Sequence, residues 1–342
     1  MPKYDYLLIG PYPFGHSKQI GGATILFKIL VDSCNENRIL NAVIPTNKFQ
    51  GKFYNLVNFF LVLMKAIRLI PLSGTIFLNV NRRGYVYIAP FISFYTWIWN
   101  RKFVLRIFGG DAIDIYLLSG FVQKWILYRL YKSCSLLFCE TKAEVNFFKS
   151  VNPRSFWFPN SRPLGANFIS RHYAKKFVYI SQIKESKGIL VLLNVFQELD
   201  STYQLEIYGP IIEPKLDWIK STKYYKGILN FDSVTRVLNE QNVLILPTFH
   251  HGEGYPGIII EAYMMSIPVI TTNWKSIKDI VAIGRSGILV EPNSKESLKA
   301  AILSIDPLNY IILNHGAYEL AIEFDSKRIH NQIHNIVNSV DN

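Results

Sequence analysis

Two glutamates and the residues between them form the part of the sequence best suited to chemistry. Glu253 stands in a Gly- and His-rich stretch after the apolar run Val243–Leu246, and Glu261 follows eight residues later. Gly257 begins a run with helical apolar spacing, so we expect Glu261 about one turn inside that helix. In an open α/β sheet, ligands bind where the carboxyl end of a strand leads into a helix. This segment is therefore the predicted ligand site.

The start of that helix is suited to an anion. The backbone amides of residues 257–259 are expected to lack partners within the helix, and the helix dipole adds positive charge there. A diphosphate would satisfy both. Glu261 is then placed to accept hydrogen bonds from ribose hydroxyls, and Glu253 to reach a sugar. An isolated glutamate pair is more often one capping acid and one surface acid, but the preceding strand and the following segment Ser266–Ile270 make this pair more specific.

These residues resemble the retaining glycosyltransferases of family 4, which have a two-domain GT-B fold and two glutamates separated by seven residues. Glu253–Ala262 matches that motif, and Ile267–Thr271 and Gly287–Pro292 match the two segments that follow it in the family. The resemblance implies a sugar-nucleotide donor, with Glu253 at the sugar and Glu261 at the ribose. The implied donor-binding positions here are Gly254, Tyr255, Pro256, Gly257, Ile258 and Glu261.

A second segment, residues 178–188, resembles the family's strand, Gly-Arg turn and Lys-Gly helix start. Lys187 matches the lysine that neutralises the donor diphosphate, a role that suits a compact ammonium group. Taken alone, such a lysine is more often a solvated residue at a helix start. Gln182 stands where the family usually has arginine, so Lys184 or an arginine from elsewhere would have to take that contact. Gly209, directly after the next apolar run, completes the donor-side set.

The first half of the chain holds the candidates for the acceptor side. Gly21 and Gly22 open a helix after the first apolar run, where glycines let the backbone approach a phosphate or a sugar. Phe103–Asp111 resembles the family's strand beside the acceptor, but Phe-Gly-Gly stands where the family often has a histidine. Asp111 could orient or deprotonate an acceptor hydroxyl, or it could cap a helix. His16 is the second acceptor-side candidate.

Apolar runs predict the elements that position these residues. Short continuous runs alternate with helix-length segments, which predicts parallel sheets covered on both faces. Pro, Asn and Gly interrupt the pattern between residues 152 and 171. The predicted fold is α/β, a GT-B pair of Rossmann-like, doubly wound parallel sheets facing a central cleft: an acceptor-side domain over 1–165 and a donor-binding domain over 166–324, with a C-terminal helix near 325–342 packing back on the first. The predicted strands are Tyr6–Ile9, Ile39–Ile44, Thr75–Val80, Phe103–Phe108, Leu136–Cys139, Phe177–Ile180, Gln204–Tyr208, Val243–Leu246, Pro268–Thr272 and Ile288–Val290.

Positive charge is concentrated in the first half. The chain has a net charge of +12, yet residues 1–165 hold 20 Lys and Arg against 7 Asp and Glu, whereas residues 166–342 hold 17 against 18. Such a domain attracts acidic lipid headgroups, phosphorylated acceptors or nucleic acid, unless its charge is only a solvated face. Nucleic-acid binding would not explain the glutamate segment, so we expect no nucleic-acid partner. The pattern favours an acceptor on an anionic membrane, such as a polyprenyl-diphosphate-linked oligosaccharide.

The cysteine content and the N-terminus predict a cytoplasmic protein. Three cysteines without a Cys-x-x-Cys or Cys/His cluster indicate neither a disulfide framework nor a zinc site, and the first residues lack the apolar stretch of a secretory signal. The apolar stretches 56–72 and 85–99 are interrupted by charges or proline, so neither is expected to span a membrane. The first suits a helix that packs on the core or one that lies on a membrane surface. The expected location is the cytoplasm, with peripheral attachment to the inner face of the plasma membrane.

Together these features predict a retaining glycosyltransferase. It would move a sugar from a UDP- or GDP-sugar to a glycan or lipid-linked acceptor in bacterial surface polysaccharide biosynthesis. The resemblance implies that helix dipoles and basic side chains offset the leaving charge, so no metal or other cofactor is required. Two alternatives stay open. A sugar-nucleotide epimerase of the same fold would need no acceptor, and a non-catalytic partner subunit would account for Gln182 and the missing histidine.

Overall fold

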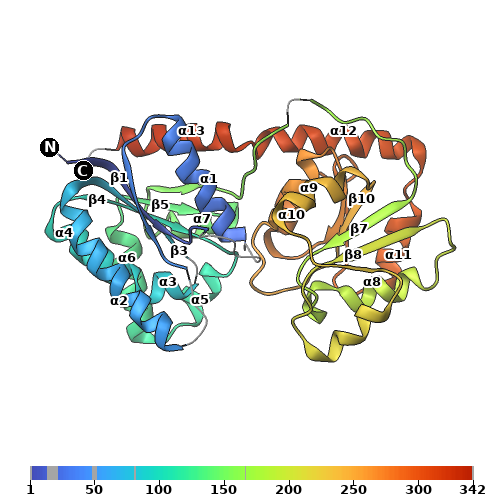
Figure 1. The fold of residues 1–342 in the computed structure, drawn as a ribbon, viewed down its shortest axis with the longest axis horizontal. Coiled ribbons are helices and arrows are strands. Elements are labelled where there is room, and N and C mark those ends of the chain that lie inside the picture. Colours follow the sequence, from blue (N-terminus) through green and yellow to red (C-terminus); the bar gives the residue numbers. More distant parts are fainter. Residues whose placement is uncertain (1, 14–21, 48–51, 81, 166, 341–342) are drawn as a thin grey trace. The chain divides into compact units, whose positions relative to one another are not determined.

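The chain folds into two compact units. The computed structural model describes residues 2–13, 22–47, 52–80, 82–165 and 167–340. Unit 1 comprises Met1–Pro159 and Ser326–Asn342, and unit 2 comprises Asn160–Asp325 (Figure 1). The boundary expected at residue 165 therefore falls inside unit 2. The reason is that the side chains of Asn160 and Arg162 already bond to residues of unit 2.

Unit 1 is a parallel sheet with helices on both faces. Over the described residues, six strands lie in the order β2-β1-β3-β4-β5-β6. The strands are β1 (Tyr4–Gly10), β2 (Asn41–Pro45), β3 (Ser73–Val80), β4 (Lys102–Ile107), β5 (Leu136–Cys139) and β6 (Ser155–Trp157). The helices are α1 (Gly22–Glu36), α2 (Lys52–Leu69), the short 3-10 turn η1 (Ile70–Leu72), α3 (Arg82–Tyr87), α4 (Ala89–Ile98), α5 (Ala112–Leu118), α6 (Phe121–Ser133), α7 (Lys142–Phe148) and α13 (Ser326–Ser339).

Alternate residues of the strands in unit 1 fill two separate core layers. Leu7 and Ile9 of β1 pack in one layer with residues of α2, α4 and α6, whereas Tyr6 and Leu8 pack in the other with residues of α1 and α13. Successive side chains of a strand point to opposite faces, so each strand contributes to both layers. The helices on the two sides of the sheet are visible in Figure 1. Continuous apolar strands are the expected sequence pattern of such a sheet.

The last helix, α13, is built into unit 1 rather than unit 2. Ile329, Ile333 and Val337 recur at four-residue spacing, and all three are buried in the core layer beneath α1 and α13. A hydrogen bond of 3.3 Å between His334 Nε2 and Ser33 Oγ joins α13 to α1. The chain thus crosses into unit 2 at Asn160 and returns at Ser326.

The apolar helix α2 has one face in the core and one face outside it. Val62, Leu63 and Ala66 are buried in the core layer, while Phe60 and Met64 are exposed. Among the described residues, Asn55–Leu72 is the one stretch long and apolar enough to cross a membrane by length and composition; its mean hydropathy is 1.6 and 22% of it is buried. The sequence predicted that this stretch does not span a membrane; by length and composition it could, and its buried residues pack in the core of unit 1.

Unit 2 has the same architecture. Its described strands lie in the order β12-β11-β10-β7-β8-β9, and all pairs are parallel. The strands are β7 (Lys176–Ile180), β8 (Gln204–Tyr208), β9 (Tyr225–Gly227), β10 (Val243–Leu246), β11 (Val269–Thr272) and β12 (Gly287–Val290). The helices are α8 (Ile189–Phe196), α9 (Phe231–Asn239), α10 (Gly257–Met264), α11 (Lys295–Leu303) and α12 (Pro307–Glu323), with 3-10 turns η2 (Glu185–Lys187), η3 (Pro214–Ser221) and η4 (Lys275–Ile280).

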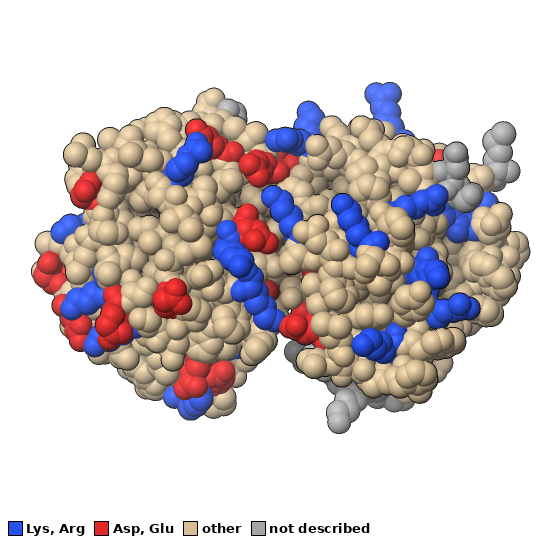
Figure 2. Space-filling model, turned by 180° about the vertical axis from the view of Figure 1, so that it is seen from behind, with Lys and Arg blue, Asp and Glu red and all other residues tan. Residues whose placement is uncertain are grey.

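All ten predicted strands are present, which confirms the predicted α/β fold with two parallel sheets. Two further strands, β6 and β9, were not predicted. Both are three-residue strands at the end of a sheet, too short to give an apolar run. Figure 2 shows the charge asymmetry of the two halves: unit 1, at the right, carries mainly Lys and Arg on the face shown, while unit 2 carries both signs.

We predict that Ile333→Ala destabilises unit 1. The substitution removes buried methyl groups and leaves a cavity under α13, so the free energy of unfolding should fall by about 2–5 kcal/mol. Urea unfolding followed by circular dichroism measures this change. Ile311→Ala, on the exposed side of α12, is the matched control and should change stability by no more than about 0.5 kcal/mol. Equal effects of the two substitutions would show that α13 adds nothing to the core.

Candidate functional site

The candidate site of unit 2 lies at the point where the strand order of its sheet reverses. β7 is the first strand of the unit, and the sheet grows from it toward β8 on one side and toward β10 on the other. The loops at the carboxyl ends of β7 and β10 therefore leave the sheet side by side, and such a position is where ligands bind in open α/β sheets. Lys187 follows β7 and Glu253 follows β10. The two loops are joined by a backbone hydrogen bond of 2.8 Å from Phe249 N to Ser186 O.

Lys187 and Glu253 form an ion pair across these loops. Lys187 Nζ donates to Glu253 Oε2, and the hydroxyl of Thr248 donates to the same oxygen at 3.2 Å. Only 11% of the lysine side chain and 12% of the glutamate side chain are exposed. A charge in such a position is strongly disfavoured without a partner, so each neutralises the other. The structure thus joins the residue predicted for the diphosphate to the residue predicted for the sugar.

Glu261 has a charged partner that the sequence did not reveal. Arg162 Nε donates to Glu261 Oε1 at 2.8 Å, and Arg162 Nη2 lies 2.7 Å from the same oxygen. A third nitrogen, Nη1, donates to the carbonyl of Ser161 at 2.9 Å, which fixes the plane of the guanidinium. Arg162 stands in the proline- and asparagine-rich segment that the sequence pattern assigned to a linker, and nothing in its neighbours along the chain signals this contact.

The N-terminus of α10 differs in one respect from the prediction. Pro256 occupies the N-cap position, and Ile259 N donates to Pro256 O at 3.0 Å. The amide of Ile259 is therefore engaged, and the predicted set of three unpaired amides is reduced to those of Gly257 and Ile258. Gly257 has a steric role as well, because a Cβ at this position would lie 2.6 Å from Nη2 of Arg162.

The other donor-side residues divide into buried and accessible ones. Tyr255 is buried, and its hydroxyl lies 3.5 Å from Asp279 Oδ2, so its ring packs within unit 2; its donor-binding role stays a prediction. Gly254 and Pro256 are buried beside it, and Ile258 is half-buried. Gln182 is exposed and Lys184 is half-buried.

Gly209 is required by the turn after β8. Its φ is +143°, and a Cβ there would lie 1.8 Å from the carbonyl oxygen of Ser181. At Gly209 the backbones of the loops after β7 and β8 lie in close contact. Packing at the carboxyl edge of the sheet, where β7 and β8 end, thus explains why a glycine stands at this position. Its donor-binding role stays a prediction.

His250 lies in the same loop as Glu253 and is uncharged near neutral pH. Burial lowers the pKa of its imidazole, and the nearby ammonium of Lys187 lowers it further, while Glu253 opposes the shift. Nδ1 lies 3.2 Å from the hydroxyl of Ser186. This contact links His250 to the loop after β7.

In unit 1 the predicted acceptor-side residues are only partly visible. His16 and Gly21 lie outside the described residues, and Gly22 begins α1. Asp111 occupies the N-cap position of α5, but its side chain makes no capping hydrogen bond to that helix. A buried acid that the sequence did not single out, Glu140, lies nearby and accepts a hydrogen bond of 3.0 Å from Gly109 N. Asp111 is therefore not explained by simple helix capping.

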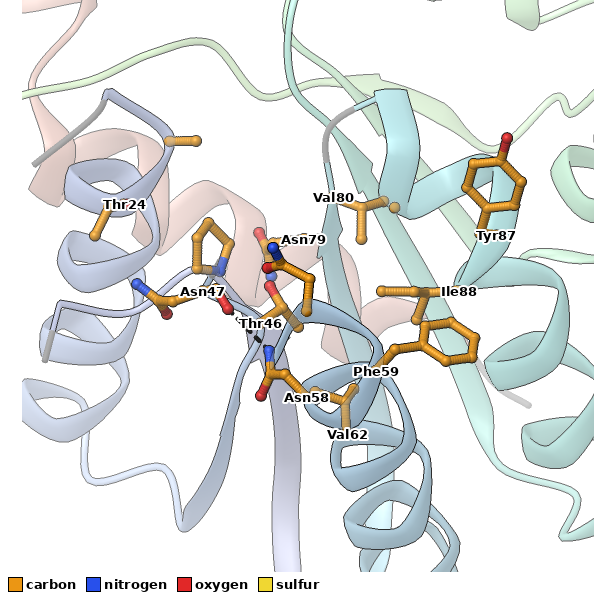
Figure 3. A pocket seen from close by; sticks show the side chains of 14 residues that line it. Thr24, Thr46, Asn47, Asn58, Phe59, Val62, Asn79, Val80, Tyr87 and Ile88 are labelled. Atoms are coloured by element: carbon orange, nitrogen blue, oxygen red, sulfur yellow. Dashed lines mark hydrogen bonds between the residues drawn. The ribbon is translucent and has the colours of Figure 1, made fainter. Parts of the chain in front are cut away.

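A cavity of about 570 Å³ opens in unit 1 at the carboxyl ends of β1, β2 and β3 (Figure 3). Its described lining contains no charged side chain, although unit 1 is strongly basic. Asn58 Nδ2 donates to the carbonyl of Asn47 at 2.8 Å, while the buried Asn79 Oδ1 has no hydrogen-bond partner among the described residues. Phe59 and the exposed Tyr87 form an aromatic side of the cavity. The polar lining residues are Thr24, Thr46, Asn47, Asn55, Asn58 and Asn79.

The donor-side region matches a known family. Residues 174–305, which lie within unit 2, match the model of the glycosyl transferases group 1 family. The match includes Lys187, Glu253 and Glu261, whereas Arg162 precedes it.

Two curated proteins that the chain resembles are named as glycosyltransferases. The capsular polysaccharide biosynthesis glycosyltransferase CapM of Staphylococcus aureus is 25% identical over 173 residues, which are 47% of this chain and 45% of CapM. The putative colanic acid biosynthesis glycosyltransferase WcaL of Salmonella typhimurium is 21% identical over 184 residues, which are 48% of this chain and 45% of WcaL. The chain thus spans about half the length of the curated relatives it matches.

The fold itself recurs in solved structures. The Anabaena protein Alr3699/HepE, in complex with UDP, superposes with a TM-score of 0.74 over 98% of this chain and 100% of that chain, at 13% identity. A likeness at this identity concerns the fold. The chain has the GT-B fold, as the sequence predicted.

We predict that Lys187→Met destabilises unit 2 and that a second substitution restores it. Removing the ammonium leaves Glu253 nearly buried without its charged partner, which should cost about 1–3 kcal/mol of unfolding free energy. In Lys187→Met/Glu253→Gln the remaining group is neutral, and most of the loss should be recovered. Urea unfolding of the two single variants and the double variant measures the coupling. Additive losses would show that the two side chains act independently.

Proposed function

We propose that this chain is a retaining glycosyltransferase that moves a sugar from a nucleotide-diphosphate sugar, such as a UDP- or GDP-sugar, to a glycan or polyprenyl-diphosphate-linked acceptor. The observation that carries the proposal is the arrangement of two ion pairs, Lys187–Glu253 and Arg162–Glu261, beside the N-terminus of α10 where the sheet order reverses. The match of residues 174–305 to the group 1 glycosyltransferase model supports the proposal. The names of CapM and WcaL support a role in bacterial surface polysaccharide biosynthesis.

In the proposed donor complex, the diphosphate replaces the carboxylate of Glu253 as the partner of Lys187. The amides of Gly257 and Ile258 and the dipole of α10 favour an anion, and Lys187 supplies a mobile positive charge. When Lys187 turns to the diphosphate, Glu253 loses its partner and becomes available to the hydroxyls of the sugar. The exchange keeps the number of unpaired charges low at each stage, which limits the desolvation cost.

Glu261 is held ready for the ribose. Both contacts from Arg162 use Oε1, so Oε2 is left to accept a hydrogen bond from a ribose hydroxyl. A carboxylate that is already fixed by a guanidinium loses little side-chain entropy when a ligand binds. We therefore add Arg162 to the donor-side residues as the group that positions Glu261.

The proposed chemistry needs positive charge at the leaving phosphate, and Lys187 with the α10 dipole supplies it without a metal. Retention of configuration follows if the acceptor hydroxyl attacks from the face that the nucleotide leaves, with a phosphate oxygen taking the proton. Glu253 then stabilises the sugar without forming a covalent bond. Asp111 and His16 are the proposed acceptor-side groups.

For the acceptor we propose an uncharged sugar in the cavity of unit 1. Amide side chains donate and accept at the same time, which suits the hydroxyls of a saccharide, and the ring of Tyr87 offers an apolar surface. The oxygen of Asn79 would gain a donor that it lacks. The proposed setting is the cytoplasmic side of the plasma membrane, with the basic unit 1 attached to anionic lipid.

We predict that nucleotide binding and turnover separate at the two glutamates. UDP or GDP should raise the melting temperature of the wild-type chain. Glu261→Ala should weaken nucleotide binding about 10- to 100-fold, because the ribose loses a charged hydrogen-bond acceptor. Glu253→Ala should leave nucleotide affinity largely intact and depress sugar transfer. Thermal shift with UDP, GDP, ADP and their sugars, followed by a transfer assay with and without EDTA, measures both effects.

Several results would contradict this proposal. If no nucleotide shifted the melting temperature, unit 2 would not bind a sugar nucleotide, and a partner-subunit role would be favoured. Donor consumption without any acceptor would indicate an epimerase. Loss of transfer in EDTA, with recovery on adding Mg²⁺ or Mn²⁺, would overturn the metal-independent mechanism.

We predict that Tyr87→Ala weakens binding of uncharged sugars to unit 1. Saturation-transfer NMR with methyl glucosides, methyl galactosides and methyl glucuronides should show signals for one or more neutral glycosides and weaker signals for the charged ones. The signals should fall in Tyr87→Ala and persist in Tyr128→Ala, which changes an exposed tyrosine on α6 outside the cavity. Equal signals in both variants would remove the cavity from the proposal.

A further inference from the structure

One side of unit 1 exposes a broad group of large apolar side chains. They come from α2, from α4, from the end of α5 and from the first turns of α6. The exposed fraction of Trp97 is 74%, that of Leu118 is 86% and that of Phe121 is 88%. We call this surface the apolar face and define it by Phe60, Met64, Trp97, Leu118, Phe121 and Trp125. A soluble surface rarely exposes so many large apolar groups together, so the face needs a partner.

The apolar face is continuous because its helices share one core layer. Val62 of α2, Ile92 of α4 and Leu127 of α6 are all buried in the layer on the same side of the sheet. The hydroxyls of Ser93 on α4 and Ser133 on α6 lie 3.2 Å apart. With their inner sides in one layer, the outer sides of these helices point away from the sheet together (Figure 1).

The charged residues of α2 and α6 are all positive and α4 has none, while α5 carries Asp114 one turn before Leu118. The sequence contains no Asp or Glu between Asn37 and Gly110, nor between Ile115 and Cys139. Lys65 and Arg68 are exposed on α2, and Lys124, Arg129 and Lys132 belong to α6. Arg129 lies over the ring of Trp125, with its guanidinium carbon 5.8 Å from the ring centre. The face therefore combines tryptophan and phenylalanine with basic groups and no acid of its own.

We propose that the apolar face docks onto the surface of an anionic lipid bilayer. Phe121 and Leu118, at the turn between α5 and α6, enter the boundary between headgroups and acyl chains, and α2 and α4 lie along it. Tryptophan favours this boundary because its ring is apolar and its N–H is polar. The lysines and arginines meet the acidic headgroups. The inference rests on the proposed function in one respect: it supplies the surface by which unit 1 would reach a lipid-linked acceptor.

A second copy of the chain is a poorer partner. A twofold interface would place the same basic residues opposite one another, with no acid from α2, α4 or α6 to pair with them. Insertion of α2 as a membrane span is also disfavoured, because Val62, Leu63 and Ala66 would have to leave the core of unit 1.

Unit 2 offers a matched control surface. Leu308, Ile311 and Ile312 on α12 are 79%, 54% and 57% exposed, so this helix also presents apolar side chains. The same helix carries Glu319 and Glu323 and no Lys or Arg. If any exposed apolar group were enough for lipid binding, α12 would contribute as well. The proposal requires that it does not.

Flotation of the full chain with vesicles tests the proposal. Two vesicle types are used, phosphatidylcholine alone and phosphatidylcholine with phosphatidylglycerol at three to one. The variants are Phe121→Ser/Trp125→Ser on the apolar face and Leu308→Ser/Ile311→Ser on α12. All four substituted residues are exposed, so neither variant should unfold, and the thermal shift with UDP checks that both still fold and bind nucleotide.

The wild-type chain and the α12 variant should float with the phosphatidylglycerol vesicles and stay largely soluble with phosphatidylcholine. The apolar-face variant should lose at least 10-fold in apparent affinity for the anionic vesicles. Equal binding of the two variants, or a wild-type chain that stays soluble with both vesicle types, would overturn the proposal. So would light scattering that showed a dimer which Phe121→Ser/Trp125→Ser converts to a monomer. Because UDP binding is measured in the same samples, failure of the lipid proposal is distinguishable from failure of the proposed donor site.

Discussion

Two acidic and two basic side chains are largely buried at the carboxyl edge of the sheet in unit 2. Each is stable there only because it contacts a side chain of opposite charge. Lys187 and Glu253 are both nearly buried, and so is Arg162 beside Glu261. Removing a single member would leave a charge with neither water nor a partner. The loops after β7 and β10, the helix α10 and the glycine at its start are arranged so that these pairs can form. The same requirement means that an anionic ligand can bind to one of these basic side chains only by displacing its acidic partner. Ligand binding would therefore change the ion pairs of the site.

The two units use one architecture for different surfaces. In unit 2 the carboxyl edge of the sheet gathers charged side chains, and in unit 1 the corresponding edge is hollowed into a cavity with amide and aromatic walls. The basic charge of unit 1 lies elsewhere, including the helices that cover one side of its sheet. A division of this kind suits a protein that holds a doubly charged ligand in one unit and an uncharged group in the other, and it explains why net charge alone did not locate the cavity.

The fold was predictable to the extent that apolar runs were long. Ten strands of four or more residues were identified because each gives an apolar run, whereas β6 and β9 have only three residues each. The glutamates and Lys187 were identified by spacing and by resemblance. Arg162 was not, because its role depends on a contact across 99 positions of the chain. Tyr255 was assigned to the ligand from its place in the motif, and the burial of its side chain could not be predicted from that place.

The position of Arg162 has a consequence for how the chain can be divided. Its backbone pairs with that of Asp325, and its amide donates to the carbonyl of Phe324 at 3.1 Å, so the segment that enters unit 2 and the segment that leaves it are tied together next to Glu261. A fragment cut at residue 166, where the sequence pattern suggested a linker, would lack the guanidinium that fixes this carboxylate. A fragment that keeps the contacts around Glu261 has to begin at or before Asn160 and retain Asp325.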